Sequence, residues 1–128
     1  MIDIQSRQNV GMGLLLLLMV VFAVHHAGDF YVPDSDFFDF QEKAQAWVRG
    51  EMPENTKRLP MYSVVIAVVS RLMPGEHPFL HAAQWINVLA LLGTLILVFV
   101  IARRWLGAWA FWCVWFMALN PVILKMLV

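Results

Sequence analysis

Three long apolar runs constrain the fold of this chain more than any other feature of its sequence. They cover residues 10–27, 79–102 and about 105–122. A helix needs about 20 apolar residues to cross a hydrocarbon core that is roughly 30 Å thick, and all three runs approach that length. Composition agrees, because 61% of the residues are hydrophobic and 14% are charged, whereas soluble domains are about 45–50% apolar and about 25% charged. The sequence therefore predicts an all-α integral membrane protein with three transmembrane helices.

The first run has a second interpretation as a cleaved signal peptide, since Arg7 precedes its apolar core. The plausible cleavage point follows Ala27, and it places His25 where cleavage requires a small residue. We therefore expect an uncleaved helix.

Basic residues near the apolar runs predict the orientation, because arginine and lysine are retained on the cytoplasmic side. Arg103 and Arg104 lie between the second and third runs, and Arg7 lies before the first. We expect a multi-pass protein of the plasma or inner membrane, with a cytoplasmic amino terminus and with residues 28–78 forming a loop on the periplasmic or outer face. The chain has no net charge, so its charge balance does not predict a nucleic-acid partner.

The outer loop contains an amphipathic pattern, from which we expect a helix over about residues 35–49. At about 100° per residue, one stripe of this helix is apolar. The stripe consists of Phe37, Phe40, Ala44, Trp47 and Val48, whereas Asp39, Lys43 and Ala46 lie off it and Phe38 is an exception. We expect such a helix to lie on the membrane surface with its acids in solvent.

A second short helix is expected over about residues 60–73. Pro60 suits the first position of a helix, and Pro74 with Gly75 ends it. Its apolar part would span about 20 Å at roughly 1.5 Å per residue. Because that is too short to cross the membrane, this helix is also expected at the interface. The three spans and the two interfacial helices would form a single membrane module over residues 1–128.

The order and spacing of residues in the outer loop resemble a known family. An aspartate is followed by two aromatic residues, a small residue, a glycine, a basic residue, a proline and a short apolar helix. These residues are Asp36, Phe37, Phe38, Ala44, Gly50, Arg58, Pro60 and the run MYSVVIAVVSRL. The pattern resembles the amino-terminal part of the GT-C class of multi-spanning glycosyltransferases. This class uses polyprenyl-phosphate sugars and includes protein O-mannosyltransferases and the aminoarabinose transferase of lipid A.

The resemblance implies that the catalytic carboxylate lies at the start of the first loop helix. By its spacing from Ala44 this role falls on Asp36, and Asp34 is the rival because family members often have Pro-Asp just before the helix. The implied substrate-binding residues are Lys57, Arg58 and Tyr62. If a divalent cation such as Mg²⁺ or Mn²⁺ takes part, Asp36 and Asp34 are its candidate ligands. The chain reads RLPMYS where relatives often have a double proline, so the alignment of Arg58 with the family pattern is approximate.

The implied reaction transfers the sugar of a polyprenyl-phosphate donor to a hydroxyl group of a glycan, lipid or protein acceptor. By analogy with glycoside hydrolysis, it passes through an oxocarbenium-like transition state while negative charge grows on the departing phosphate. A carboxylate such as Asp36 can take the acceptor's proton as general base, and Lys57, Arg58 or a metal ion can stabilise the departing group. Asp39, on the same helix, is expected to be a solvated acid without a catalytic role.

Simpler interpretations stand beside this one. Asp34 can serve only as a helix cap, and Asp36 can be one of several solvated acids near a helix amino terminus. For the whole chain, the alternative is a small non-enzymatic membrane protein that acts as an assembly subunit or a lipid-binding module. Because enzymes of the GT-C class have many more spans, the resemblance implies that these 128 residues are the amino-terminal part of a longer enzyme.

Overall fold

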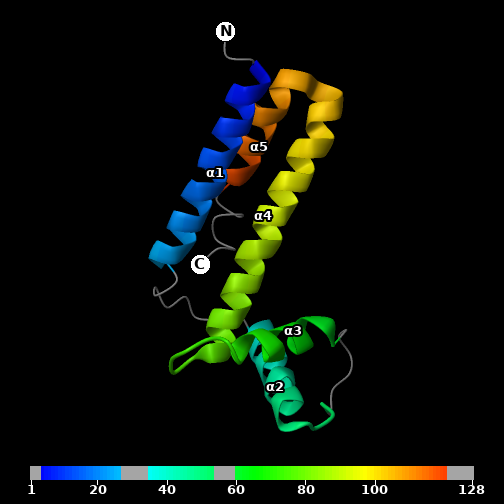
Figure 1. Ribbon diagram of the computed structural model, residues 1–128. Helices are drawn as coiled ribbons and strands as arrows, with labels where there is room; N and C mark the ends of the chain where they lie inside the picture. Colours follow the sequence, from blue (N-terminus) through cyan, green and yellow to red (C-terminus); the bar gives the residue numbers. More distant parts are fainter. Residues whose placement is uncertain (1–3, 27–34, 54–59, 121–128) are drawn as a thin grey trace. The chain divides into compact units, whose positions relative to one another are not determined.

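The computed structural model describes residues 4–26, 35–53 and 60–120. Every regular element in these residues is a helix, which confirms the predicted all-α class. The elements are α1 (Ile4–His26), α2 (Ser35–Arg49), α3 (Met61–Ser70), α4 (Pro78–Leu106), the 3₁₀ helix η1 (Gly107–Trp109) and α5 (Ala110–Ala118) (Figure 1).

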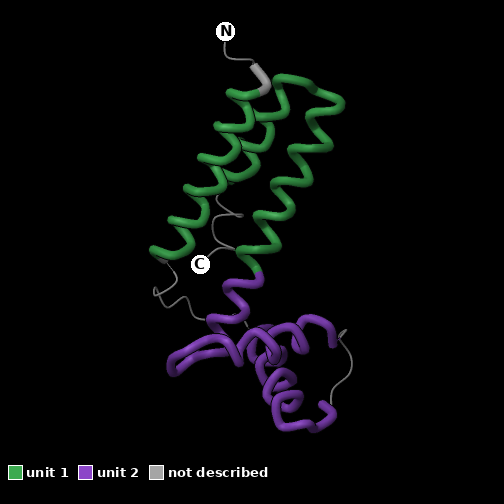
Figure 2. Tube along the Cα trace, viewed as in Figure 1, with its two compact units in different colours: residues 1–29, 87–128 green, residues 30–86 purple. Residues whose placement is uncertain are grey.

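The chain groups into two compact units (Figure 2). Unit 1 comprises Met1–Asp29 and Asn87–Val128, and unit 2 comprises Phe30–Ile86. The helix α4 contributes to both, since it begins in unit 2 and ends in unit 1. The sequence analysis predicted that residues 1–128 form a single membrane module. The division into two units does not test this, so it stays a prediction.

Two stretches are long and apolar enough to cross a membrane, judged by length and composition. They are Ser6–His25 and Pro78–Ala118, and the second contains the run 79–102 and most of the run 105–122. The predicted break between those runs falls later than expected, because α4 continues to Leu106 and turns at Gly107, whose φ is +54°. The nine residues of α5 extend about 14 Å at roughly 1.5 Å per residue. The end of the third predicted span lies outside the described residues, so three spans stay a prediction.

Unit 1 exposes large apolar side chains along its helices. Those that are more than half exposed include Leu14, Leu17 and Leu18 of α1 and Leu97, Val100 and Ile101 of α4. A helix that is apolar on all sides suits either a protein core or lipid. These exposed apolar side chains belong to helices that are long and apolar enough to cross a membrane, judged by length and composition.

Unit 1 also contains a close contact between α1 and α5. A Cβ atom added to Gly11 of α1 would lie 2.7 Å from a ring carbon of Phe111 in α5. Small residues let helices approach closely in membranes. Gly11 is therefore the residue that allows α5 to pack against α1.

We expect Gly11→Leu to loosen the contact between α1 and α5, because the new side chain must displace the Phe111 ring. Overpacking of this kind costs about 1–3 kcal/mol. Gly13→Leu is the matched control, since a Cβ at Gly13 meets no atom within 4 Å. Thermal unfolding of the two purified variants in detergent checks the prediction, and equal losses of stability would contradict it.

Unit 2 is built from α2, α3 and the first turns of α4. Its core consists of Ala44, Ile66, Ala67, Ala82 and Ala83, and the side chains packed around it include Phe37, Phe40, Trp47, Tyr62 and Phe79. The alanines let the helices approach each other, and the rings fill the remaining space. The bounds of α2 match the predicted range.

The ends of α2 and α3 follow from local backbone chemistry. At the end of α2, Gly50 has φ +76°, its N–H donates to Trp47 O, and the N–H of Glu51 donates to Ala46 O. This is a Schellman motif, in which glycine adopts the left-handed conformation without steric cost. The helix α3 is shorter than predicted and has ten residues, or about 15 Å at roughly 1.5 Å per residue. Its length is therefore well below what a span requires.

Candidate functional site

Asp36, the predicted catalytic residue, lies in the first turn of α2 and its side chain is exposed. The next residue, Phe37, is half-buried and packs against the core of unit 2. Phe38 follows with 55% of its surface exposed, and the Phe37 and Phe38 rings meet edge to face with centroids 6.0 Å apart. The backbone that carries Asp36 is thus anchored by its neighbour, while Asp36 itself is an exposed residue.

Tyr62, a predicted substrate-binding residue, lies in α3 and is half-buried. Its ring meets the ring of Phe40 edge to face, with centroids 5.0 Å apart and an interplanar angle of 89°. Aromatic pairs in this arrangement stabilise by about 0.5–1.5 kcal/mol beyond the area that they bury. Tyr62 therefore helps to fix the beginning of α2 on α3, and its role in binding substrate stays a prediction.

The other predicted site residues, Asp34, Lys57 and Arg58, lie outside the described residues. Of the two predicted metal ligands, Asp36 and Asp34, the structure therefore describes only Asp36. Within residues 4–26, 35–53 and 60–120, three or more His, Cys, Asp or Glu side chains never come together in a group that could hold a metal ion. The predicted Mg²⁺ or Mn²⁺ site is not tested by these residues.

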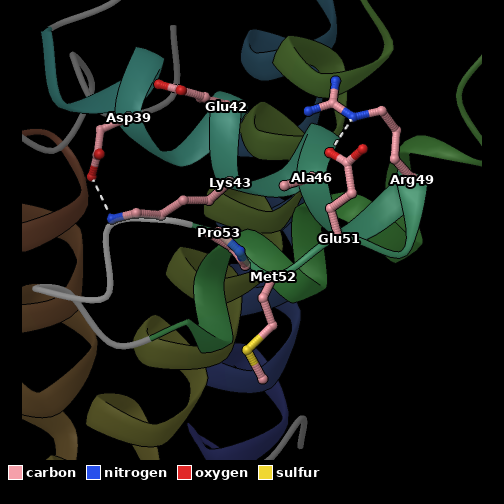
Figure 3. Close-up of a pocket in the computed structure, with 8 residues that line it drawn as sticks. All are labelled: Asp39, Glu42, Lys43, Ala46, Arg49, Glu51, Met52 and Pro53. Carbon is pink, nitrogen blue, oxygen red and sulfur yellow. Dashed lines mark hydrogen bonds and ion pairs between the residues drawn. The ribbon is translucent and has the colours of Figure 1, made fainter.

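A charged pocket of about 470 Å³ lies along one side of α2 and the residues that follow it (Figure 3). Its lining consists of Asp39, Glu42, Lys43, Ala46, Arg49, Glu51, Met52 and Pro53. Two ion pairs lie within the lining. Lys43 Nζ is 2.8 Å from Asp39 Oδ2, and Arg49 Nε is 2.7 Å from Glu51 Oε2.

The two ion pairs differ greatly in burial. The Lys43 and Asp39 side chains are 5% and 30% exposed, whereas the Arg49 and Glu51 side chains are 57% and 60% exposed. Figure 3 shows Lys43 extended toward Asp39 at one end of the pocket. A charge buried as fully as that of Lys43 needs a partner, because its desolvation is costly when it is left alone.

The burial of Lys43 corrects the sequence analysis, which placed Asp39, Lys43 and Ala46 off the packed stripe. Phe37, Phe40, Ala44 and Trp47 do pack in the core as predicted, but Val48 is 40% exposed, and Lys43 and Ala46 are buried. The chain that follows the Schellman motif places Met52 and Pro53 at the same pocket as Lys43 and Ala46. The sequence feature that could have predicted the ion pair is the spacing of four residues between Asp39 and Lys43.

A second groove of about 570 Å³ lies on another side of α2. Aromatic and polar side chains share its lining, among them Phe37, Phe38, Gln41, Gln45, His77 and Phe79. Binding pockets commonly combine apolar and aromatic walls with a few polar groups that orient the ligand. Aromatic rings beside amide and imidazole groups suit a ligand that has both apolar surface and hydrogen-bonding groups.

The chain has no match among the family models, the curated proteins or the solved structures with which it was compared.

Proposed function

We propose that this chain is the amino-terminal part of a GT-C-class membrane glycosyltransferase that moves a sugar from polyprenyl phosphate to a hydroxyl acceptor. The observation that carries the proposal is the placement of Asp36. Asp36 is an exposed residue in the first turn of α2, while Phe37 beside it packs against the core of unit 2. A general base needs a carboxylate on a well-supported backbone, and this placement supports that role for Asp36.

In the proposed reaction, the acceptor oxygen forms a bond to the anomeric carbon of the sugar as the bond from that carbon to the donor phosphate breaks. Asp36 takes the acceptor's proton, and polyprenyl phosphate leaves with the bonding electron pair. Lys57 and Arg58 stabilise the negative charge that grows on the leaving phosphate. One carboxylate does not define a cation site, so the proposal assigns no step to a metal ion.

We propose that α3, rather than α2, brings unit 2 to the surface of the membrane. The apolar stripe of α2 is used for packing inside unit 2. On α3 and just beyond it, Met61, Val65, Val68 and Leu72 are 70%, 38%, 60% and 77% exposed. Their spacing places them on one face of a helix, and an exposed apolar face of this kind fits a lipid interface. A transferase for lipid-linked donors needs its site at that level.

The proposed topology has three spans in the plasma or inner membrane, a cytoplasmic amino terminus and unit 2 on the outer face. The third span would begin with α5, which runs back beside α1 after the turn at η1 (Figure 1). In a Cys113→Ser background, we expect an impermeant thiol reagent to label Met52→Cys in intact cells. We expect it to label Ala108→Cys only after permeabilisation. Both parent side chains are exposed, and the reverse labelling pattern would overturn the topology.

The function is tested by expressing the complete natural reading frame that contains this chain. Membranes that contain the protein are then incubated with a panel of polyprenyl-phosphate hexoses and pentoses. The expected result is loss of sugar from at least one lipid donor, with polyprenyl phosphate as product, in membranes that contain the protein and not in matched membranes without it. If the correctly inserted protein consumes none of these donors, the non-enzymatic alternative replaces the proposal.

A further inference from the structure

Three arginines lie at one end of unit 1. Arg7 is in α1 near its start, and Arg103 and Arg104 are in the last turn of α4. Figure 1 shows the start of α1 beside the turn that joins α4 to α5. Two hydrogen bonds confirm that these segments meet: Gln8 Nε2 donates to Ala108 O at 3.1 Å, and Arg103 Nη1 donates to Asn9 Oδ1, also at 3.1 Å.

The Arg103 guanidinium is held in a defined position. Besides its bond to Asn9, its Cζ lies 5.9 Å from the centroid of the Phe99 ring, an arrangement in which the ring attracts the cation. Arg103 is half-buried, whereas Arg7 and Arg104 are exposed. An arginine that only favours a cytoplasmic location for its segment needs a positive charge but not a fixed side-chain orientation. The charge and a fixed orientation are two separate properties. Arg103 has both.

Among the residues that the structure describes, the charged groups at this end of unit 1 are all positive. Asp3, four residues before Arg7 in the sequence, lies outside those residues. The described residues of unit 1 contain no aspartate or glutamate. Trp105 and Trp109, in the same turn, are 82% and 72% exposed. Exposed tryptophans beside arginines are typical of the level where lipid headgroups begin.

We propose that Arg7, Arg103 and Arg104 form a binding site for the phosphate of an anionic phospholipid, with Trp105 and Trp109 beside its headgroup. Arginine suits this ligand because its planar guanidinium presents several N–H donors to phosphate oxygens. Basic pockets between membrane helices on the cytoplasmic side bind anionic headgroups in the same way. The site does not depend on the proposed glycosyl transfer, since none of these residues belongs to unit 2.

The site is tested by native mass spectrometry of the purified chain in a neutral detergent, with equal amounts of phosphatidylglycerol and phosphatidylcholine. We expect preferential retention of phosphatidylglycerol. Each of Arg7→Gln, Arg103→Gln and Arg104→Gln should weaken its binding by roughly fivefold. Arg71→Gln is the matched control, because Arg71 is an exposed arginine of unit 2, and it should leave retention unchanged.

A variant that keeps every charge separates a built site from general attraction. Asn9→Ala releases Arg103 without changing the charge, and we expect roughly two- to fivefold weaker retention from the loss of one hydrogen bond. Excess inorganic phosphate should not displace the lipid, because the exposed tryptophans contact the headgroup region as well. Equal retention of the two lipids, full displacement by phosphate, or the same loss in Arg71→Gln as in Arg103→Gln would each overturn the proposal.

Discussion

Asp36→Asn is expected to slow sugar transfer by roughly 10²–10⁴-fold, the usual contribution of a general base. This corresponds to about 3–5 kcal/mol in the activation free energy at roughly 1.36 kcal/mol per factor of ten. Asparagine keeps the size of the side chain but cannot take the acceptor's proton at neutral pH. If Asp36 only favoured the helix amino terminus, its replacement would change stability by about 0.3–1 kcal/mol and leave the rate nearly unchanged. Transfer rates of the purified complete enzyme distinguish these outcomes.

Glu42→Gln is the matched control for Asp36→Asn. Glu42 is another exposed acid of α2, and we expect its replacement to leave transfer within a fewfold of the parent rate, as for a surface residue. Asp34→Asn is expected to give an intermediate loss, because Asp34 is the rival for the same role. An Asp36→Asn enzyme that turned over as fast as Glu42→Gln would remove Asp36 from the mechanism.

The sequence predicted α2 well because its signals are local, whereas α3 is shorter than predicted. The periodicity of α2 and the glycine after Arg49 defined a helix whose bounds the structure confirms. The end of α4 was less predictable. Arg103 and Arg104 suggested a loop, but basic residues are favourable in the last turn of a helix, and the turn instead uses the positive φ of Gly107.

The candidate site was predictable only in part, since its supports are tertiary contacts. The resemblance to the GT-C pattern selected Asp36 and Tyr62, but the packing of Tyr62 against Phe40 depends on how α3 meets α2. One period along a helix identifies a single packed stripe. It does not identify burial away from that stripe, such as the burial of Lys43, because such burial depends on tertiary contacts that the period does not encode.

Asp39→Asn is expected to destabilise the protein by about 3 kcal/mol, the lower end of what the loss of one partner costs a buried ion pair. The lower end applies because the Asp39 side chain is 30% exposed while that of Lys43 is 5% exposed. The cost arises on the lysine, whose ammonium would stay buried without a carboxylate beside it. Chemical unfolding of the purified chain in detergent, followed by tryptophan fluorescence, measures the change in the free energy of unfolding.

Two further variants test whether the loss of stability in Asp39→Asn comes from the burial of Lys43 or from the loss of an ion pair as such. Glu51→Gln breaks the exposed pair with Arg49, and exposed pairs contribute about 0–1 kcal/mol, so its effect should be small. Lys43→Met in the Asp39→Asn background should recover most of the lost stability, because methionine has a similar length and no charge to bury. Equal losses in Asp39→Asn and Glu51→Gln would show that Lys43 reaches water in solution. If Asp39→Asn causes a large loss of stability, the substitution lowers the amount of folded enzyme and thereby slows transfer, although Asp39 has no catalytic role. Transfer rates of the Asp36 and Asp39 variants are therefore compared at equal amounts of folded protein.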